Sequence, residues 1–166
     1  MADAQGVIIC DSFTGTLVSS SPRFADVTGE DWFRPYVAYV AASKLFQGTG
    51  YGLFSPDSVM TRGMLVTVLG RLSGMDPAAY SESAFSDVDA QAYYAPYAAW
   101  AHESGLITGR GLSLSGPEPT PYFAPDAPVT REELAVIISR YAAFSGHALD
   151  GSGPESAYGD AGDISD

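Results

Sequence analysis

Apolar and polar positions follow helical spacing in four stretches of the chain, and the four stretches form two similar pairs. In the second stretch of each pair, apolar side chains recur every three or four residues, which is typical of a helix that buries one face. These side chains are Met64, Leu65, Val68, Leu69 and Leu72 in one copy and Leu134, Ile137, Ile138 and Tyr141 in the other. We therefore expect two amphipathic helices, which begin at Thr61 and Thr130.

A shorter helix is expected ahead of each of these. Asp31 suits the N-cap of the first one, and Pro35 suits its first turn because proline has no amide hydrogen to leave unpaired there. The residues that follow at helical spacing are Tyr36, Val37, Val40, Ala41 and Lys44 in the first copy and Pro96, Tyr97, Trp100 and Ala101 in the second. Gly105 is expected to end the second of these helices.

The starts of the two longer helices differ in one respect. Thr130 and Glu133 form a capping box, in which each residue bonds the backbone amide of the other. The first copy has Met64 in place of that glutamate, so it keeps the threonine cap and loses the reciprocal bond. Gly74 and Gly146 suit the two helix ends.

An internal repeat underlies this pairing. Phe24-Ala25-Asp26-Val27 matches Phe85-Ser86-Asp87-Val88 at an offset of 61, and Phe54-Ser55-Pro56-Asp57 matches Phe123-Ala124-Pro125-Asp126 at an offset of 69. The difference falls in residues 110–122, which are rich in Gly, Pro and Ser and read as a lengthened loop.

The pattern opens a third time at Tyr158-Gly159-Asp160, but the chain ends before the helices of that copy. The expected organisation is an all-α protein with long loops. Its parts are an N-terminal segment or linker (1–23), repeat 1 (24–75), a linker (76–84), repeat 2 (85–144), a second linker (145–157) and the start of a truncated repeat 3 (158–166).

Composition narrows the possible functions. The 166 residues are 46% hydrophobic, enough for a core, and carry a formal net charge of −12. That charge excludes a nucleic-acid-binding face, which must be basic, and a polybasic membrane patch. The single cysteine cannot form an internal disulfide or a zinc site. We expect no membrane-spanning segment, no metal and no cofactor.

The repeated motifs resemble those of S-layer homology repeats. The family pattern is Phe-x-Asp-Val, a Trp or Tyr before a first helix, a glycine turn, Phe-x-Pro-Asp, and Thr-Arg-Ala-Glu at the start of a second helix. The first copy reads FADV, DWFRPYVAYV, LFQGTG, FSPD and MTRGMLVTVLGRL, and the second reads FSDV, YYAPYAAWA, GLITG, FAPD and VTREELAVIISRY. The resemblance covers residues 24–144 almost completely.

This resemblance implies a fold and a role. In the family, three repeats usually pack into a pseudo-threefold helical bundle, which binds secondary cell-wall polysaccharide attached to peptidoglycan, often pyruvylated. It implies a non-catalytic, extracellular module at the bacterial cell wall or S-layer surface. The sequence departs from the pattern at Lys44, which replaces a glycine, and at Gly63-Met64, which replaces Ala-Glu.

The resemblance also places candidate binding residues. Arg62 and Arg131 follow the capping threonines, where free amides and the helix dipole favour an anion such as a sugar-linked pyruvate. The alternative is that these arginines pair with Asp26, Asp57, Asp87 or Asp126. Asp57 and Asp126, from the Phe-x-Pro-Asp loops, are also candidate ligand contacts.

Aromatic residues and glycines complete the candidate site. Trp32 and Tyr93 either stack on sugar faces or pack against the helices. Gly48 and Gly109 suit turns of positive φ, and their amides are expected to face the ligand groove. Core positions are expected for Tyr36, Tyr97 and Trp100, and loop anchors for Phe24, Phe54, Phe85 and Phe123.

Two functions remain open. One is a glycan-binding anchor, in which Arg62 should be the better anion site because repeat 1 is neutral and places no glutamate beside it. The other is a structural or assembly module, whose arginines form internal ion pairs and whose incomplete third repeat docks another chain or segment, including by self-association.

Overall fold

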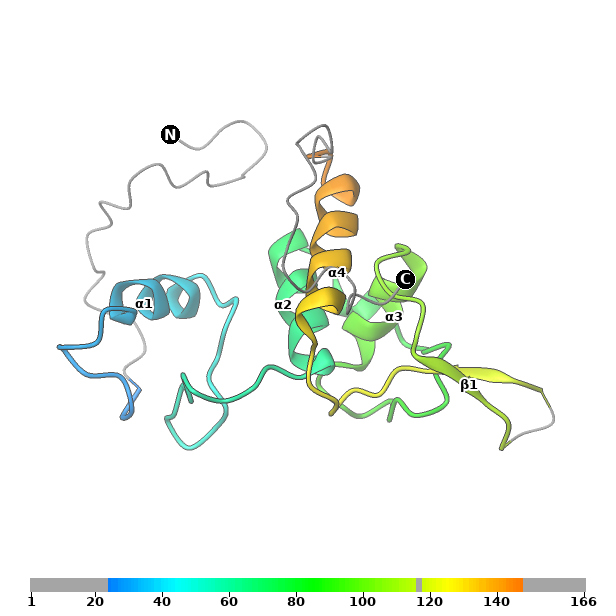
Figure 1. Ribbon diagram of the computed structural model, residues 1–166, viewed down its shortest axis with the longest axis horizontal. Coiled ribbons are helices and arrows are strands. Elements are labelled where there is room, and N and C mark those ends of the chain that lie inside the picture. The colour runs from blue at the N-terminus through cyan, green and yellow to red at the C-terminus, as the bar shows by residue number, and fades with distance from the viewer. Residues whose placement is uncertain (1–23, 116–117, 148–166) are drawn as a thin grey trace, which may run out of the picture. The chain divides into compact units, whose positions relative to one another are not determined.

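The computed structural model describes residues 24–115 and 118–147 (Figure 1). The chain forms two compact units, residues 1–56 and 57–166, and each is considered by itself. Helix α1 (Arg34–Ala42) lies in the first unit. The elements of the second unit are α2 (Arg62–Ser73), the short 3₁₀ helix η1 (Pro77–Ala79), α3 (Ala95–Glu103), β1 (Gly111–Ser113), β2 (Thr120–Tyr122) and α4 (Arg131–Phe144).

The boundary between the compact units falls inside the first sequence repeat. Residues 76–84 read as a linker in the sequence, but η1 lies within them and packs on α3. Helix α2, which ends repeat 1, packs against α3, which opens repeat 2. The physical unit that buries α2 is therefore made from parts of two repeats.

One apolar cluster forms the core of the second unit. Helix α2 contributes Leu65, Val66 and Leu69, which are at most 4% exposed. The cluster is completed by Phe85, Ala98, Trp100, Ala101, Leu106, Ile107, Phe123 and Ile137. Burial of Phe85, Phe123 and Trp100 confirms their expected structural roles, since each is less than 5% exposed.

Two glycines let α2 and α3 approach closely. A methyl group on Gly63 would lie 3.0 Å from a ring carbon of Tyr94, and one on Gly70 would lie 2.4 Å from a ring carbon of Tyr97. The second distance is too short for any real contact, so this interface requires glycine at position 70. The fit at Gly63 is tight but less restrictive, because Tyr94 would have to shift by only a few tenths of an ångström to admit a methyl group there.

Helix α4 lies on this cluster through a narrow face. Ile137 is 5% exposed and joins the core, with Tyr141 packed against it. The ring of Phe144 meets Trp100 edge-on, at a centroid distance of 5.7 Å. Ile137 is the one residue of α4 that is buried, which leaves much of this helix at the surface.

The lengthened loop of repeat 2 forms a small antiparallel hairpin. Strand β1 pairs with β2, with Leu112 opposite Pro121 (Figure 1). The expected all-α class is broadly consistent with the α-helices of the described residues, but it did not include this hairpin. The Gly, Pro and Ser content of residues 110–122 gave no strand signal.

The first unit contains α1 and the loop that follows it. Pro35 lies in the first turn of α1, as expected, but the N-cap is Phe33 and not Asp31. The Asp31 carboxylate instead accepts bonds from the amide and hydroxyl of Thr28, at 2.6 and 2.9 Å. Lys44 lies beyond the end of the helix, with φ of +59°. Tyr36 is 54% exposed, so its expected core position is wrong.

The starts of the two longer helices match expectation. Thr61 accepts a hydrogen bond from the Met64 amide at 3.3 Å, and Thr130 with Glu133 forms the complete capping box. Gly74 ends α2 in the left-handed conformation. Among the described residues, no helix combines the length and apolar character needed to cross a membrane. The segments 1–23, 148–157 and 158–166 lie outside the described residues.

Candidate functional site

An aspartate at the start of each repeat holds the loop that carries Phe-x-Pro-Asp. The Asp87 carboxylate accepts hydrogen bonds from the amides of Phe123 and Ala124, both at 2.7 Å. In the first unit, Asp26 accepts in the same way from Phe54 at 2.8 Å and Ser55 at 2.6 Å. These amide bonds, that of Phe54 first, hold the pKa of Asp26 below its usual value. The aspartate of Phe-x-Asp-Val is thus a loop clamp in both copies.

Arg62, the first helical residue of α2, is buried within the second unit. It is 5% exposed, its Nε donates to the Phe123 carbonyl at 2.8 Å, and its guanidinium lies 4.9 Å from the centre of the Phe123 ring. Its Nη1 donates to Glu133 at 3.0 Å. Burial lowers the pKa of Arg62, and the charge of Glu133 opposes this shift. In this structure the arginine is an internal ion-pair partner, although its partner is none of the four predicted aspartates.

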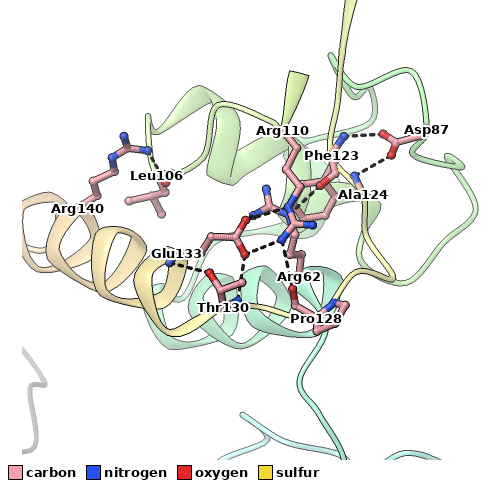
Figure 2. Close-up of polar contacts among 10 residues, drawn as sticks. All are labelled: Arg62, Asp87, Leu106, Arg110, Phe123, Ala124, Pro128, Thr130, Glu133 and Arg140. Atoms are coloured by element: carbon pink, nitrogen blue, oxygen red, sulfur yellow. Dashed lines mark hydrogen bonds and ion pairs between the residues drawn. The ribbon is translucent and has the colours of Figure 1, made fainter. Parts of the chain in front are cut away.

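Glu133 is shared between two arginines and a helix cap (Figure 2). Arg110, at the base of the hairpin, donates Nε and Nη2 to the two carboxylate oxygens at 2.9 and 2.7 Å. The backbone amide of Thr130 donates to the same carboxylate at 3.1 Å. The hydrogen bonds from Arg110, together with the Thr130 amide and the charge of Arg62, lower the pKa of Glu133 to about 2.

Backbone carbonyl groups of the second repeat also accept hydrogen bonds from the amides at the start of α2. The amide of Arg62 donates to the Ala127 carbonyl at 3.0 Å, and that of Gly63 donates to the Pro125 carbonyl at 2.9 Å. Free amides at a helix start favour an anion, but those of Arg62 and Gly63 are already satisfied by the chain itself. The expectation that Arg62 has no glutamate beside it is wrong, because Glu133 reaches it from a helix 71 residues away.

Arg131 has a different environment, although it is the repeat equivalent of Arg62. It is the first residue of α4, after the Thr130 cap, and its side chain is exposed. Whether either arginine contacts a ligand stays a prediction.

Tyr93 and Asp126 lie near each other beside the start of α2. Tyr93 is 58% exposed and Asp126 is also exposed. Partial burial raises the pKa of Tyr93 and the charge of Asp126 raises it further, while a hydrogen bond with Thr61 lowers it. The structure therefore brings together an aromatic side chain and a carboxylate that were predicted separately.

The remaining candidates lie in several places. In the first unit, Trp32 is 80% exposed, and its ring meets those of Phe33 and Tyr36 at centroid distances of 5.6 and 6.4 Å. Asp57 is exposed at the start of the second unit.

Both candidate glycines have positive φ, +77° at Gly48 and +85° at Gly109, as expected. A methyl group on Gly48 would lie 2.3 Å from the Leu53 carbonyl oxygen. These positions therefore need glycine for the turn itself, while their predicted contact with a ligand is untested.

Sequence reasoning missed the most connected residues of this region. Arg110 was assigned only to a loop, and Glu133 only to a helix cap. Arg110 has Thr49 as its repeat equivalent, so the repeat gave no reason to single it out. One difference between the repeats could have indicated this pairing. Repeat 1 has Met64 where repeat 2 has Glu133, so Arg62 has no glutamate partner within its own repeat.

Comparison with known proteins supports one family. The family model described as the S-layer homology domain matches residues 23–63 and 84–135. An endoglucanase from Bacillus sp. (strain KSM-635) is 29% identical over 147 residues, which is 89% of this chain and 14% of the relative. An amylopullulanase from Thermoanaerobacterium thermosulfurigenes is 23% identical over 141 residues, covering 78% of this chain and 7% of the relative.

An S-layer-related protein from Niallia circulans is 34% identical over 91 residues, which is 55% of this chain and 5% of the relative. The chain therefore spans a small part of each relative's length. What these relatives share with it is one segment and not a whole protein.

Proposed function

The chain belongs to the S-layer homology family, and we propose from this that it is a non-catalytic module that anchors a protein to the bacterial cell wall. The observation that carries the proposal is the family pattern, which occurs twice in one order. Its relatives bear enzyme names or an S-layer-related name and match it over one segment, as expected for an anchor shared by different proteins. The proposed location is the cell surface.

The proposed ligand is secondary cell-wall polysaccharide that carries carboxylate groups, such as pyruvylated sugars. An exposed arginine can bind such a carboxylate through two hydrogen bonds, and an exposed aromatic ring can stack on a sugar face. Arg131, Trp32 and Tyr93 have the exposure that these contacts need. We assign direct contact to these residues first.

The other predicted residues receive supporting roles in this proposal. Asp57 and Asp126 are exposed and suited to bonding sugar hydroxyls, while Gly48 and Gly109 shape the turns beside the aspartate-clamped loops. For Arg62 we propose an indirect role, in which its bonds to Phe123 and Glu133 hold the loop of repeat 2 in place. A direct contact would require Arg62 to exchange its partner Glu133 for the ligand.

The acidic charge of the chain opposes an acidic polymer at long range. Screening at physiological salt limits this repulsion to about 8 Å, so local contacts decide the affinity. Binding to an anionic polymer is therefore expected to strengthen as salt rises, until screening also weakens the contact made by Arg131.

Co-sedimentation with Gram-positive cell walls tests the proposal. The chain should pellet with intact walls and stay in solution when the secondary polymer has been stripped. Arg131→Ala and Trp32→Ala should each weaken binding by about tenfold. Arg34→Ala is the matched control, because it removes an exposed arginine from α1 and should leave binding unchanged.

The internal ion pair of Arg62 favours a second candidate function, a structural or assembly module. In that case wild-type protein that is folded would not pellet with walls of several polymer types, and Arg131→Ala would change nothing. Loss of binding in Arg62→Ala alone, with a lowered melting temperature, would indicate a structural role for that arginine.

A further inference from the structure

The carboxylate of Glu133 is held by N–H groups from three parts of the second unit (Figure 2). Arg62 on α2 donates Nη1 to Oε1 at 3.0 Å, and Arg110 at the base of the hairpin donates Nε to the same oxygen at 2.9 Å. Oε2 accepts from Arg110 Nη2 at 2.7 Å and from the backbone amide of Thr130 at 3.1 Å. Paired donors on both oxygens, two of them from one arginine fork, are the arrangement by which proteins bind a carboxylate ligand.

The two arginines are held in position by contacts that do not involve Glu133. The Nε of Arg62 donates to the Phe123 carbonyl at 2.8 Å, and its guanidinium lies 4.9 Å from the centre of the Phe123 ring. Arg110 donates from Nη2 to the Pro128 carbonyl at 3.3 Å. The donors are therefore preorganised, and they should stay in place around a different carboxylate.

The charges of this region also favour an anion at the same place. Because two guanidinium groups meet at one carboxylate, their positive charges would repel each other if the Glu133 side chain were removed. Asp87 lies near enough to Arg62 for their charges to interact. Its carboxylate is already held by the amides of Phe123 and Ala124, both at 2.7 Å, so it is not free to replace Glu133.

The network lies close enough to the surface for a small ligand to enter. The side chains of Arg110 and Glu133 are 32% and 22% exposed, whereas that of Arg62 is 6% exposed. Glu133→Ala would open the space between the two arginines from the side of the exposed Arg110. Acetate has the same heavy atoms that this substitution removes, so it matches the vacated space in size and in charge.

We propose that Arg62 and Arg110 form a carboxylate-binding site that the chain's own Glu133 fills and so closes to carboxylates from outside. The class of ligand is a small carboxylate or one carried on a sugar. Such a ligand competes with a tethered carboxylate, whose effective concentration at the site is high. One consequence rests on the function proposed above: while Glu133 is in place, Arg62 makes no direct contact with a carboxylated wall polymer.

Chemical rescue by acetate tests this site. Glu133→Ala should lower the melting temperature of the second unit. At about pH 7, about 100 mM sodium acetate should raise that temperature by about 3 °C or more relative to sodium chloride of equal ionic strength. In the wild-type chain the acetate-specific shift should stay below about 1 °C, because the site is filled. Trp100, which is 3% exposed in the core of this unit, reports unfolding by fluorescence in a Trp32→Phe background.

Control variants separate a binding site from a general effect of salt. Arg110→Ala combined with Glu133→Ala removes the arginine fork and should weaken acetate binding by about tenfold or more. Arg34→Ala combined with Glu133→Ala is the matched control, since it removes an exposed arginine from α1 and should leave the rescue unchanged. Glu103→Ala removes an exposed glutamate from α3 and should show no acetate-specific shift.

A second substitution and a second measurement keep the test decisive. Glu133→Gln removes the charge but still fills the space, so acetate should not rescue it. If Glu133→Ala is unfolded before heating, acetate should restore its helical circular dichroism, while chloride should not.

Three results would overturn the proposal. One is stabilisation of Glu133→Ala by acetate that does not exceed that by chloride. Another is an equal acetate-specific shift in the wild-type chain or in Glu133→Gln. The third is a rescue that persists unchanged after Arg110→Ala. The experiment uses acetate and no wall polymer, so its failure is distinguishable from a failure of the proposed function, which cell-wall co-sedimentation tests separately.

Discussion

Repeat 1 and repeat 2 carry the same Thr-Arg pair at the start of their second helix, yet the two arginines lie in opposite environments. Arg62 is 5% exposed and bonded to Phe123 and Glu133, whereas Arg131 is exposed. The helix starts themselves are alike, since Thr61 and Thr130 both cap through their hydroxyl groups. The loop and glutamate that cover Arg62 come from the repeat that follows it.

This contrast shows that one motif takes different roles according to its neighbour. When the next repeat's loop lies over the helix start, the arginine becomes part of an internal network. When its side chain is exposed, it can meet a ligand. A family pattern therefore locates the arginines correctly, but the role of each depends on which repeat covers it.

The largest expected effect comes from removing the covered arginine. Arg62→Ala should lower the free energy of unfolding of the second unit by about 2 to 3 kcal/mol, because it leaves the Phe123 carbonyl without its hydrogen bond, removes one of the two arginines paired with Glu133 and opens a cavity beside the Phe123 ring. Arg131→Ala should change it by less than about 0.5 kcal/mol. Urea unfolding followed by Trp100 fluorescence measures both, in a Trp32→Phe background so that one tryptophan reports. Equal effects of the two substitutions would contradict the comparison.

A second test concerns Gly70, which lies against α3 in the structure, whereas its repeat equivalent in α4 is Ser139. Gly70→Ala should destabilise the second unit by about 1 to 2 kcal/mol, since the new methyl group would overlap Tyr97 by more than the gain in helix propensity offsets. The matched change Ser139→Ala in α4 should cost less than about 0.5 kcal/mol, because that position is exposed. The same urea assay applies. A neutral Gly70→Ala would mean that α3 moves away without loss.

A third test uses acid to break the network at Glu133, whose equivalent in repeat 1 is Met64. The pKa of Glu133 falls from 4.5 to about 2 on folding, so its ionised form stabilises the protein above pH 4.5. That contribution is lost as pH falls from 4.5 towards 2.

Glu133→Gln should therefore lower stability by about 1 to 2 kcal/mol at pH 7 and bring the variant closer to wild type near pH 2. Thermal melts across this pH range measure the difference. Glu103→Gln, at an exposed site on α3, is the control and should run parallel to wild type. A wild-type–variant gap that is constant with pH would show that Glu133 acts through packing and not through its charge.

Features set by local sequence were predictable in this chain. Both threonine caps, the capping box at Thr130 and the left-handed glycines follow from residues within a few positions of one another. The buried Phe85 and Phe123 were predictable because the repeat marks them twice. The S-layer homology resemblance rests on the same local motifs, and the family match confirms it.

Features set by distant residues were not predictable. The pairing of Arg62 with Glu133 joins residues 71 positions apart, and no single repeat contains both. The prediction that Asp31 is the N-cap was wrong, because the Asp31 carboxylate accepts a hydrogen bond from Thr28 instead. Tyr36 follows the helical pattern of a core residue, but which side of α1 is covered depends on the surrounding chain.

The smallest expected effect tests the same comparison at the end of the first helix. Lys44 and Gly105 are repeat equivalents, with φ of +59° and +71°. A lysine is strained in this left-handed region because its Cβ lies too close to the backbone. Glycine has no Cβ and is therefore not strained there. Lys44→Gly should therefore raise the stability of the first unit by about 0.5 to 1 kcal/mol, and Gly105→Ala should lower that of the second by about 1 kcal/mol.

Thermal unfolding followed by Trp32 fluorescence, in a Trp100→Phe background, reports the first unit. If Lys44→Gly destabilised that unit instead, the lysine side chain would have to make contacts that outweigh its backbone strain, and the two helix ends would differ in more than one residue.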